Sequence, residues 1–151
     1  MNFYVFLNRQ KTEDRRAFII CYKANSGKTT FAKQIAEARS DVYYLDLQAY
    51  ALNHMDTFNS LKFLELKNFL LAFEAEESVI LVDNPDFLIN TWGQKDKDTF
   101  ENWLKIQLRS PGMTDKTFVF FVQNDPFFEH LQLVNSRGEA RVLPLNNFES
   151  L

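Results

Sequence analysis

The chain has few of the residues that mark several classes of protein. Its one cysteine, Cys21, cannot form an internal disulfide, and nothing in the sequence points to secretion. With 4 glycines and 4 prolines in 151 residues, it lacks the many tight turns of an all-β chain. The N-terminal apolar run, Asn2–Leu7, is too short to span a membrane, and no basic segment of a signal peptide precedes it. We therefore expect a cytoplasmic protein without membrane contact.

The chain also has little excess of one charge sign over the other. The 17 Lys and Arg residues against 20 Asp and Glu give a net charge of −3, and no block of consecutive basic residues occurs. Proteins that bind nucleic acid electrostatically carry a basic patch, so we expect DNA contact only through an oligomer or a partner. The two histidines, His54 and His130, have no second ligand at zinc-binding spacing.

Apolar residues are abundant, because they make up 46% of the chain and include 16 phenylalanines. A chain of this length buries roughly 70% of its unfolded surface, which is enough for one globular domain. We expect a single domain over residues 1–151, with an N-terminal arm or edge strand at 1–15, a core at 16–145 and a tail at 146–151.

The most informative segment is FIICYKANSGKTT, Phe18–Thr30. An apolar strand runs into a polar loop that ends in Gly27-Lys28-Thr29, and a helix is expected directly behind it. This is the layout of a phosphate-binding P-loop, in which backbone N–H groups and a helix N-terminus hold an anion. The usual pattern has glycine six residues before the lysine, where this chain has Tyr22. The residues expected to surround the phosphates are Lys23, Ala24, Asn25, Ser26, Gly27, Lys28, Thr29 and Thr30.

The loop residues have separate expected roles. Gly27 lets the backbone pass close to the phosphates, and Asn25 tolerates left-handed backbone angles at a position where glycine is common. Lys28 supplies charge to the β- and γ-phosphates, and the Thr29 hydroxyl is the expected magnesium ligand. The structural alternative is a helix N-terminus that reads Gly-Lys-Thr by coincidence. With a strand before and a helix after, the segment favours binding of ATP with Mg²⁺.

A later strand supplies the acid that magnesium needs. Val79–Val82 is followed by Asp83, which is the Walker B form, and Asp83 is the expected magnesium ligand beside Thr29. The alternative is an Asx turn leading into the next proline. ATPases of this kind usually have glutamate after the aspartate, but here it is Asn84, whose amide can hydrogen-bond a water without taking its proton. Asp86 is a substitute if the turn brings it back to the phosphate, and we expect slow or partner-dependent hydrolysis.

The remaining segments alternate between strands and helices. Uninterrupted apolar strands joined by crossover helices predict an α/β fold with a parallel sheet covered on both faces. Ligands bind such a sheet at the carboxyl ends of its strands, where the P-loop lies. We expect further strands at Val42–Leu47, Ser78–Asp83, Thr117–Val122 and Ala140–Leu145, and helices at Thr29–Arg39, Asp56–Glu76, Asp98–Leu108 and Asp125 to about Val134.

The expected helix Asp56–Glu76 has more apolar residues than one core-facing stripe needs. Either a partner covers part of its surface, around Leu64 and Phe69, or the helix is buried deeply between neighbouring elements. The sequence does not decide between these two interpretations.

The segments ANSGKTT, VILVDN and FVFFVQN resemble the core of an AAA+ or related ASCE ATPase over about Arg16–Leu145. This resemblance implies a three-layer P-loop NTPase fold with strand order 5-1-4-3-2 and little or no helical lid. It places Asn124 at the sensor-1 position, in contact with the γ-phosphate or its water, although a turn and helix cap is the alternative. It makes Arg137 and Arg141 candidate arginine fingers for a neighbouring subunit, whereas the alternative is two ordinary surface arginines.

The small size, the pair Asp83-Asn84 and the tail Arg141–Leu145 are also similar to the BrxF family, the compact P-loop proteins of BREX bacteriophage-exclusion systems. That similarity implies an ATP-responsive component of a multi-protein antiviral defence, working beside DNA-modifying partners.

Three functions follow as hypotheses. The leading one is an ATP-binding AAA+-like module that assembles as a homo-oligomer or with other protein subunits and hydrolyses ATP weakly. The enzyme alternative is a small-molecule or nucleoside kinase, although no arginine-rich lid is visible. The third is a non-catalytic interaction module that nucleotide only stabilises and whose phenylalanine-rich helix binds another protein.

Overall fold

A computed structural model describes residues 1–109 and 112–150 and has an α/β fold with five parallel strands. The fold class expected from the sequence, a parallel sheet with helices, is confirmed. The strands are β1 (Ala17–Tyr22), β2 (Val42–Asp46), β3 (Val79–Asp83), β4 (Thr117–Gln123) and β5 (Val142–Pro144). The helices are α1 (Phe3–Gln10), α2 (Lys28–Ala38), α3 (Leu47–Asn53), α4 (Phe63–Ala72), α5 (Asp86–Ile89), α6 (Gln94–Asn102) and α7 (Pro126–His130), with a π-helical turn η1 (Trp103–Gln107) and a 3-10 turn η2 (Leu145–Asn147).

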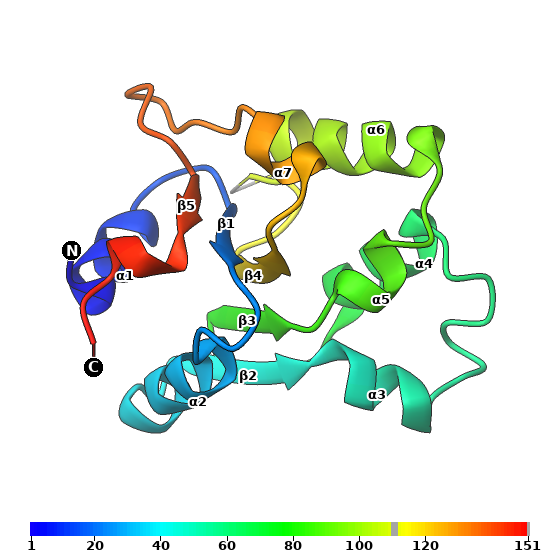
Figure 1. Ribbon diagram of the computed structural model, residues 1–151, viewed down its shortest axis with the longest axis horizontal. Coiled ribbons are helices and arrows are strands. Elements are labelled where there is room, and N and C mark those ends of the chain that lie inside the picture. The colour runs from blue at the N-terminus through cyan, green and yellow to red at the C-terminus, as the bar shows by residue number, and fades with distance from the viewer. Residues whose placement is uncertain (110–111, 151) are drawn as a thin grey trace.

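The sheet has the strand order β2-β3-β4-β1-β5 (Figure 1), which from the other edge reads 5-1-4-3-2. At its centre β1 pairs with β4 on one side and β5 on the other, so that Ile19 lies between Phe120 and Val142. Because all strands run the same way, the ends of β1, β3 and β4 meet at one edge of the sheet. The loops after Tyr22, Asp83 and Gln123 therefore lie close together.

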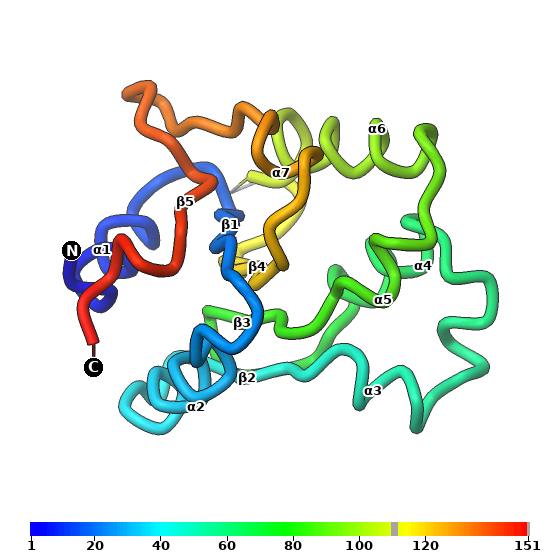
Figure 2. The backbone as a smooth tube through the Cα atoms, viewed as in Figure 1, coloured from blue at the N-terminus to red at the C-terminus, as the bar shows by residue number. Residues whose placement is uncertain are grey.

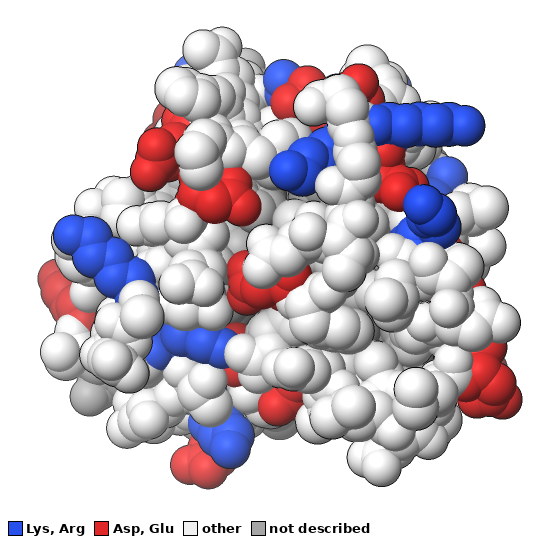
Figure 3. Space-filling model, turned by 45° about the vertical axis from the view of Figure 1, so that its right-hand side comes forward, with Lys and Arg blue, Asp and Glu red and all other residues white. Residues whose placement is uncertain are grey.

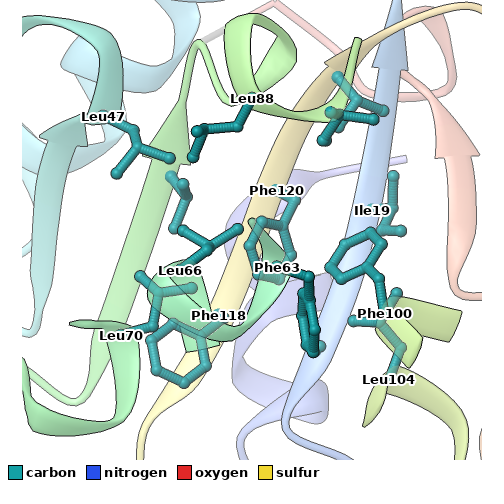
Figure 4. Close-up of a cluster of buried hydrophobic side chains, with 14 of the residues drawn as sticks. Ile19, Leu47, Phe63, Leu66, Leu70, Leu88, Phe100, Leu104, Phe118 and Phe120 are labelled. Atoms are coloured by element: carbon teal, nitrogen blue, oxygen red, sulfur yellow. The ribbon is translucent and has the colours of Figure 1, made fainter. Parts of the chain in front are cut away.

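Alternate strand residues face two separate apolar clusters, as the period of two requires. On one face, Phe18, Ile20 and Phe121 pack against α1, α2 and the tail residue Phe148. On the other face, strand residues pack against α3, α4, α5, α6, η1 and α7. Figure 4 shows this second cluster, where Phe63 of α4 and Phe100 of α6 approach Phe118 and Phe120 of β4. The sheet is thus the middle of three layers.

The N-terminal segment is a helix and not an edge strand, which decides between the two expectations for residues 1–15. Asn2 caps α1 by accepting a hydrogen bond from the Val5 N–H at 3.1 Å. Phe3 and Leu7, one turn apart, are fully buried in the cluster on the α2 side. The N-terminal segment therefore docks as a helix onto the core.

The prediction of one long helix over Asp56–Glu76 is wrong, because within this range the only helix is α4 (Phe63–Ala72). Leu61 has left-handed backbone angles (φ 56°) and separates α4 from the turns before it. Phe63, Leu66 and Leu70 are buried, whereas Leu64 is 61% exposed. Most of the apolar surplus is thus used by internal packing. The short helix α3, which directly follows β2, was not expected from the sequence.

The other boundaries differ by smaller amounts. The helix expected to begin at Asp98 begins at Gln94, and Asp98 accepts a hydrogen bond from the Gln94 side chain one turn earlier, so it lies inside the helix. Asp125 caps α7 as expected, with Pro126 in its first turn, but α7 ends at His130. The last strand is shorter than expected. Among the described residues, no helix is long and apolar enough to cross a bilayer.

Candidate phosphate-binding site

The loop between β1 and α2 makes a tight turn at the carboxyl edge of the sheet (Figure 1). Asn25 (φ 61°) and Gly27 (φ 80°) both have left-handed backbone angles. These angles fit the tolerance of Asn25 and the requirement for glycine at position 27. The helix α2 begins at Lys28, and the first N–H groups of a helix have no partner within it. Together with the helix dipole, these groups favour an anion at the loop.

Asp83, at the end of β3, is the centre of a hydrogen-bond network beside this loop. Its Oδ1 accepts from the Lys28 Nζ at 2.5 Å and from the Asn84 backbone N–H at 3.0 Å. Its Oδ2 accepts from the Thr29 hydroxyl at 3.1 Å and from the Tyr44 hydroxyl at 2.5 Å. The Asp83 side chain is 0% exposed, so these donors replace the water that a carboxylate needs. The structure thus brings the expected Lys28, Thr29 and Asp83 together.

Asn84 follows Asp83 in a left-handed conformation (φ 57°). Asparagine adopts this region more readily than most residues, because its short side chain can hydrogen-bond locally. Its side-chain oxygen accepts a short hydrogen bond from the Lys28 Nζ. The Lys28 ammonium is therefore held by two side chains at the end of β3, those of Asp83 and Asn84.

Asp86, in the first turn of α5, does lie beside the loop, as its expected role requires. Its Oδ2 accepts from the Tyr22 hydroxyl at 3.2 Å, and its Oδ1 accepts from the Gln123 N–H at 2.9 Å. Burial raises the pKa of Asp86 above its usual range, and these two hydrogen bonds oppose the rise. The Tyr22 ring also lies 5.0 Å from the Lys28 Nζ, in a cation–π contact.

Asn124 lies just beyond β4, at the same edge of the sheet as the loop. Its backbone N–H donates to the Tyr22 carbonyl at 3.0 Å, and its side chain is exposed. It lines a pocket of about 590 Å³ that extends from the loop toward the C-terminal segment. The structure places Asn124 beside the loop, with its side chain free to meet a bound group.

Arg137 and Arg141 are not brought to this site. Both precede β5, so they lie at the amino-terminal edge of the sheet, opposite the loop. Arg141 is 5% exposed and pairs with Glu13 at 3.0 Å, while Arg137 pairs with Glu139 at 2.9 Å. A buried, paired guanidinium cannot reach the nucleotide of a neighbouring subunit without losing its partner. Within the described chain Arg141 holds Glu13, and a role for Arg137 or Arg141 at the nucleotide of a neighbouring subunit stays a prediction.

A protein usually supplies only one or two of the ligands of a bound Mg²⁺, and Thr29 and Asp83 could be these two. Mg²⁺ prefers oxygen ligands, keeps several waters and takes one or two carboxylates together with substrate phosphates. The Thr29 hydroxyl and the Asp83 carboxylate lie 3.1 Å apart and supply such oxygens. Within residues 1–109 and 112–150, no group of three or more His, Cys, Asp or Glu side chains forms a metal site by itself.

Sequence reasoning missed two residues of the site. Tyr44 on β2 donates to Asp83 and the Tyr22 hydroxyl donates to Asp86. A usable signal for Tyr44 was its position two residues before the end of the strand that neighbours β3. Burial raises the pKa of both tyrosines, and hydrogen bonding or proximity to the carboxylates raises it further, so each hydroxyl keeps its proton and donates.

Comparisons of this chain with protein-family models, with curated proteins and with solved structures found no match. The interpretation of the site consequently depends on its own geometry and on the motifs of the sequence.

Proposed function

We propose that this protein is an ATP-binding P-loop module of the AAA+-like type, with weak or partner-dependent ATP hydrolysis. One observation supports it above the others. At the amino end of α2, the Asp83 carboxylate accepts hydrogen bonds from the Lys28 ammonium at 2.5 Å and from the Thr29 hydroxyl at 3.1 Å. This set supplies charge for the phosphates and oxygens for magnesium, and the unpaired N–H groups at the start of α2 face the same ligand.

Phosphate binding in this site is an exchange of partners by Lys28. In the free protein its ammonium binds Asp83 and Asn84. A polyphosphate offers several anionic oxygens in their place, and Asp83 keeps its bonds from Asn84, Thr29 and Tyr44. Bound there with the phosphates, Mg²⁺ would neutralise part of the charge that develops during phosphoryl transfer. After this exchange the buried Asp83 carboxylate still accepts three hydrogen bonds.

Slow hydrolysis follows from the groups that face the phosphate. Asn84 has an amide that orients a water without accepting its proton. Asp86 can accept a proton, but each of its oxygens already receives a hydrogen bond, one from Tyr22 and one from Gln123. A base held in this way must give up one donor before it takes a proton from water. A partner that moved α5 would release it, which is the form of activation we propose.

We propose that the protein is a nucleotide-controlled assembly component. Its motifs resemble those of the BREX defence proteins, and we propose that it acts in such a system. Figure 3 shows Lys and Arg interspersed with Asp and Glu over the face it views, without an extended field of one sign. On that face the charge distribution gives no basis for direct electrostatic binding of DNA. Any DNA contact would then come through assembly or a partner.

Calorimetric titration with Mg·ATP tests this function. Wild-type protein should bind one equivalent, and Lys28→Ala should abolish binding without changing the far-UV circular dichroism. Lys95→Ala, a change of the same kind at an exposed position on α6, should bind like wild type. Sedimentation with and without saturating Mg·ATP then tests assembly. Equal binding by wild type and Lys28→Ala would disprove the P-loop assignment.

A kinase function has one observation in its favour. A second pocket of about 360 Å³ lies between α3, the segment after it and α5, and its lining residues include no charged side chain. It is adjacent to the site along the chain, because Phe87 lines the pocket and follows Asp86 directly. An uncharged acceptor fits such a lining. Loss of ATP only in the presence of a nucleoside or other small acceptor would favour this function over the assembly module.

A further inference from the structure

The pocket beside the loop continues well beyond the phosphate-binding residues. One wall is formed by the loop and by α2, whose Thr30 and Gln34 lie one turn apart on the same side. The other wall is formed by the end of β5 and the segment after it, through Pro144, Leu145, Asn146, Phe148, Glu149 and Ser150. With a volume of about 590 Å³, the pocket is in the range that drug-sized ligands and cofactors occupy. Phosphates held at the loop would leave most of it unfilled.

The C-terminal segment is fixed in place by the rest of the fold. Pro144 pairs with Cys21 in the register of β1 and β5, immediately before the loop. Phe148 is 7% exposed, and its ring contacts those of Phe3 and Phe6 at 5.2 and 5.4 Å. The Glu149 N–H then donates to the Met1 carbonyl at 2.8 Å. Figure 2 shows the two chain ends side by side, and the wall is therefore formed without a ligand.

Apart from Glu149, whose carboxylate lies 3.6 Å from the Met1 ammonium, the C-terminal wall of the pocket is uncharged. Leu145, Pro144 and Phe31 supply apolar surface, while Asn146 and Gln34 supply amides. Apolar faces with a few amides suit a flat heteroaromatic ring and a sugar. An inorganic polyphosphate or a phosphorylated side chain would gain nothing from this wall. Because an amide presents both a donor and an acceptor, it satisfies either adenine or guanine.

We infer that residues 144–148 form the nucleoside-binding wall of the site, so that its ligand is a nucleoside triphosphate held at both ends. This inference depends on the proposed P-loop function, and it adds that the C-terminal segment takes the place of a separate lid. Asn146 lines the pocket and is the residue that contacts the nucleoside, whereas its neighbour Asn147 does not line the pocket.

The test compares Mg·ATP with Mg·tripolyphosphate, a ligand that has the phosphates without the nucleoside. In calorimetry, wild type should bind tripolyphosphate at least about tenfold more weakly than ATP, which corresponds to roughly 1.4 kcal/mol. Asn146→Trp, which fills the pocket from an exposed position, should weaken ATP at least about tenfold and leave tripolyphosphate within about twofold. Leu145→Ala should act in the same direction. Asn147→Trp is the matched control and should leave both affinities unchanged.

Each outcome separates the two ideas. If wild type binds neither ligand, the proposed function fails and the inference fails with it. If both ligands bind but Asn146→Trp leaves ATP affinity unchanged, the P-loop function stands and the nucleoside wall is disproved. Equal weakening of ATP and tripolyphosphate in Asn146→Trp also overturns the inference, because the segment would then act on the phosphate end.

Discussion

The Tyr44 hydroxyl donates a hydrogen bond at 2.5 Å to Oδ2 of Asp83, which joins β2 to the buried carboxylate at the end of β3. A hydrogen bond to a charged group contributes about 1.5–3 kcal/mol when both partners are removed from water. Tyr44 is only partly buried, so we expect Tyr44→Phe to lower the free energy of unfolding by about 1–2 kcal/mol. Urea unfolding measures this directly.

Tyr43→Phe is the control for this change. Tyr43 points to the other side of β2, where its ring contacts that of Phe73 at 5.3 Å. Losing a hydroxyl there should alter stability by less than about 0.5 kcal/mol. If Tyr44→Phe and Tyr43→Phe lower the free energy of unfolding equally, the hydrogen bond from Tyr44 to Asp83 does not stabilise the fold as predicted.

Asp86 should make the stability of the protein depend on pH in an unusual direction. Burial raises the pKa of Asp86, so the folded protein keeps this proton at pH values where the unfolded chain has lost it. Stability contributed by this group therefore falls as pH rises from about 4, the ordinary pKa of aspartate, through the raised value. Asp86→Asn has no such proton and should be more stable than wild type at neutral pH, with the difference vanishing near pH 4.

Urea midpoints at intervals between pH 4 and pH 8 test this prediction. Asp98→Asn, at an exposed position on α6, should follow the wild-type curve. Parallel curves for wild type and Asp86→Asn would show that burial of Asp86 does not govern the pH dependence.

Asn84 sets the rate of hydrolysis in our proposal, and Asn84→Asp should raise it. Aspartate keeps the size and the tolerance of left-handed angles that the site requires (φ 57°) and adds a group that accepts a proton. General-base catalysis contributes about 10²–10⁴-fold, and we expect at least about tenfold, since the bond to Lys28 lowers the basicity of the new carboxylate. Phosphate release under saturating Mg·ATP is the measurement.

Asn90→Asp adds the same charge at the end of α5, away from the loop, and should leave the rate unchanged. A rate in Asn84→Asp no higher than in wild type would mean that proton transfer at this position does not limit turnover.

Gly27 and Gly93 form a matched pair for testing the loop conformation. A β-carbon at either position meets nothing within 4 Å, but only Gly27 has a left-handed φ, 80°. Gly27→Ala should cost about 1–2 kcal/mol of stability and should weaken Mg·ATP, because the backbone must turn away from the phosphates. Gly93→Ala should change stability by less than about 1 kcal/mol and leave binding intact. Because neither variant introduces a clash, a difference between them in unfolding and calorimetry measures the conformational strain at Gly27.

Much of the fold could be read from local patterns. The apolar strands, the helix behind Lys28 and the cap at Asp125 each depend on residues close in sequence, and they appear where they were expected. The prediction of one long helix over residues 56–76 was wrong because Leu61 has left-handed backbone angles, which leucine rarely adopts and which no pattern in the neighbouring residues indicates. The start of α6 also differs from the prediction, since the helix begins at Gln94 and Asp98 lies inside it, where its side chain accepts a hydrogen bond from Gln94.

By itself, the sequence determined that the chain forms a parallel α/β sheet and that Lys28, Thr29 and Asp83 belong to one site, because strand ends and the loop motif are local signals. Only the tertiary structure decided which distant groups join that site. It brought Tyr44 to Asp83 and Tyr22 to Asp86, placed the C-terminal segment along the same pocket as the loop, and moved Arg141 to the far edge of the sheet. These outcomes follow from strand order and register, which are set by the packing of the whole core and not by any single segment.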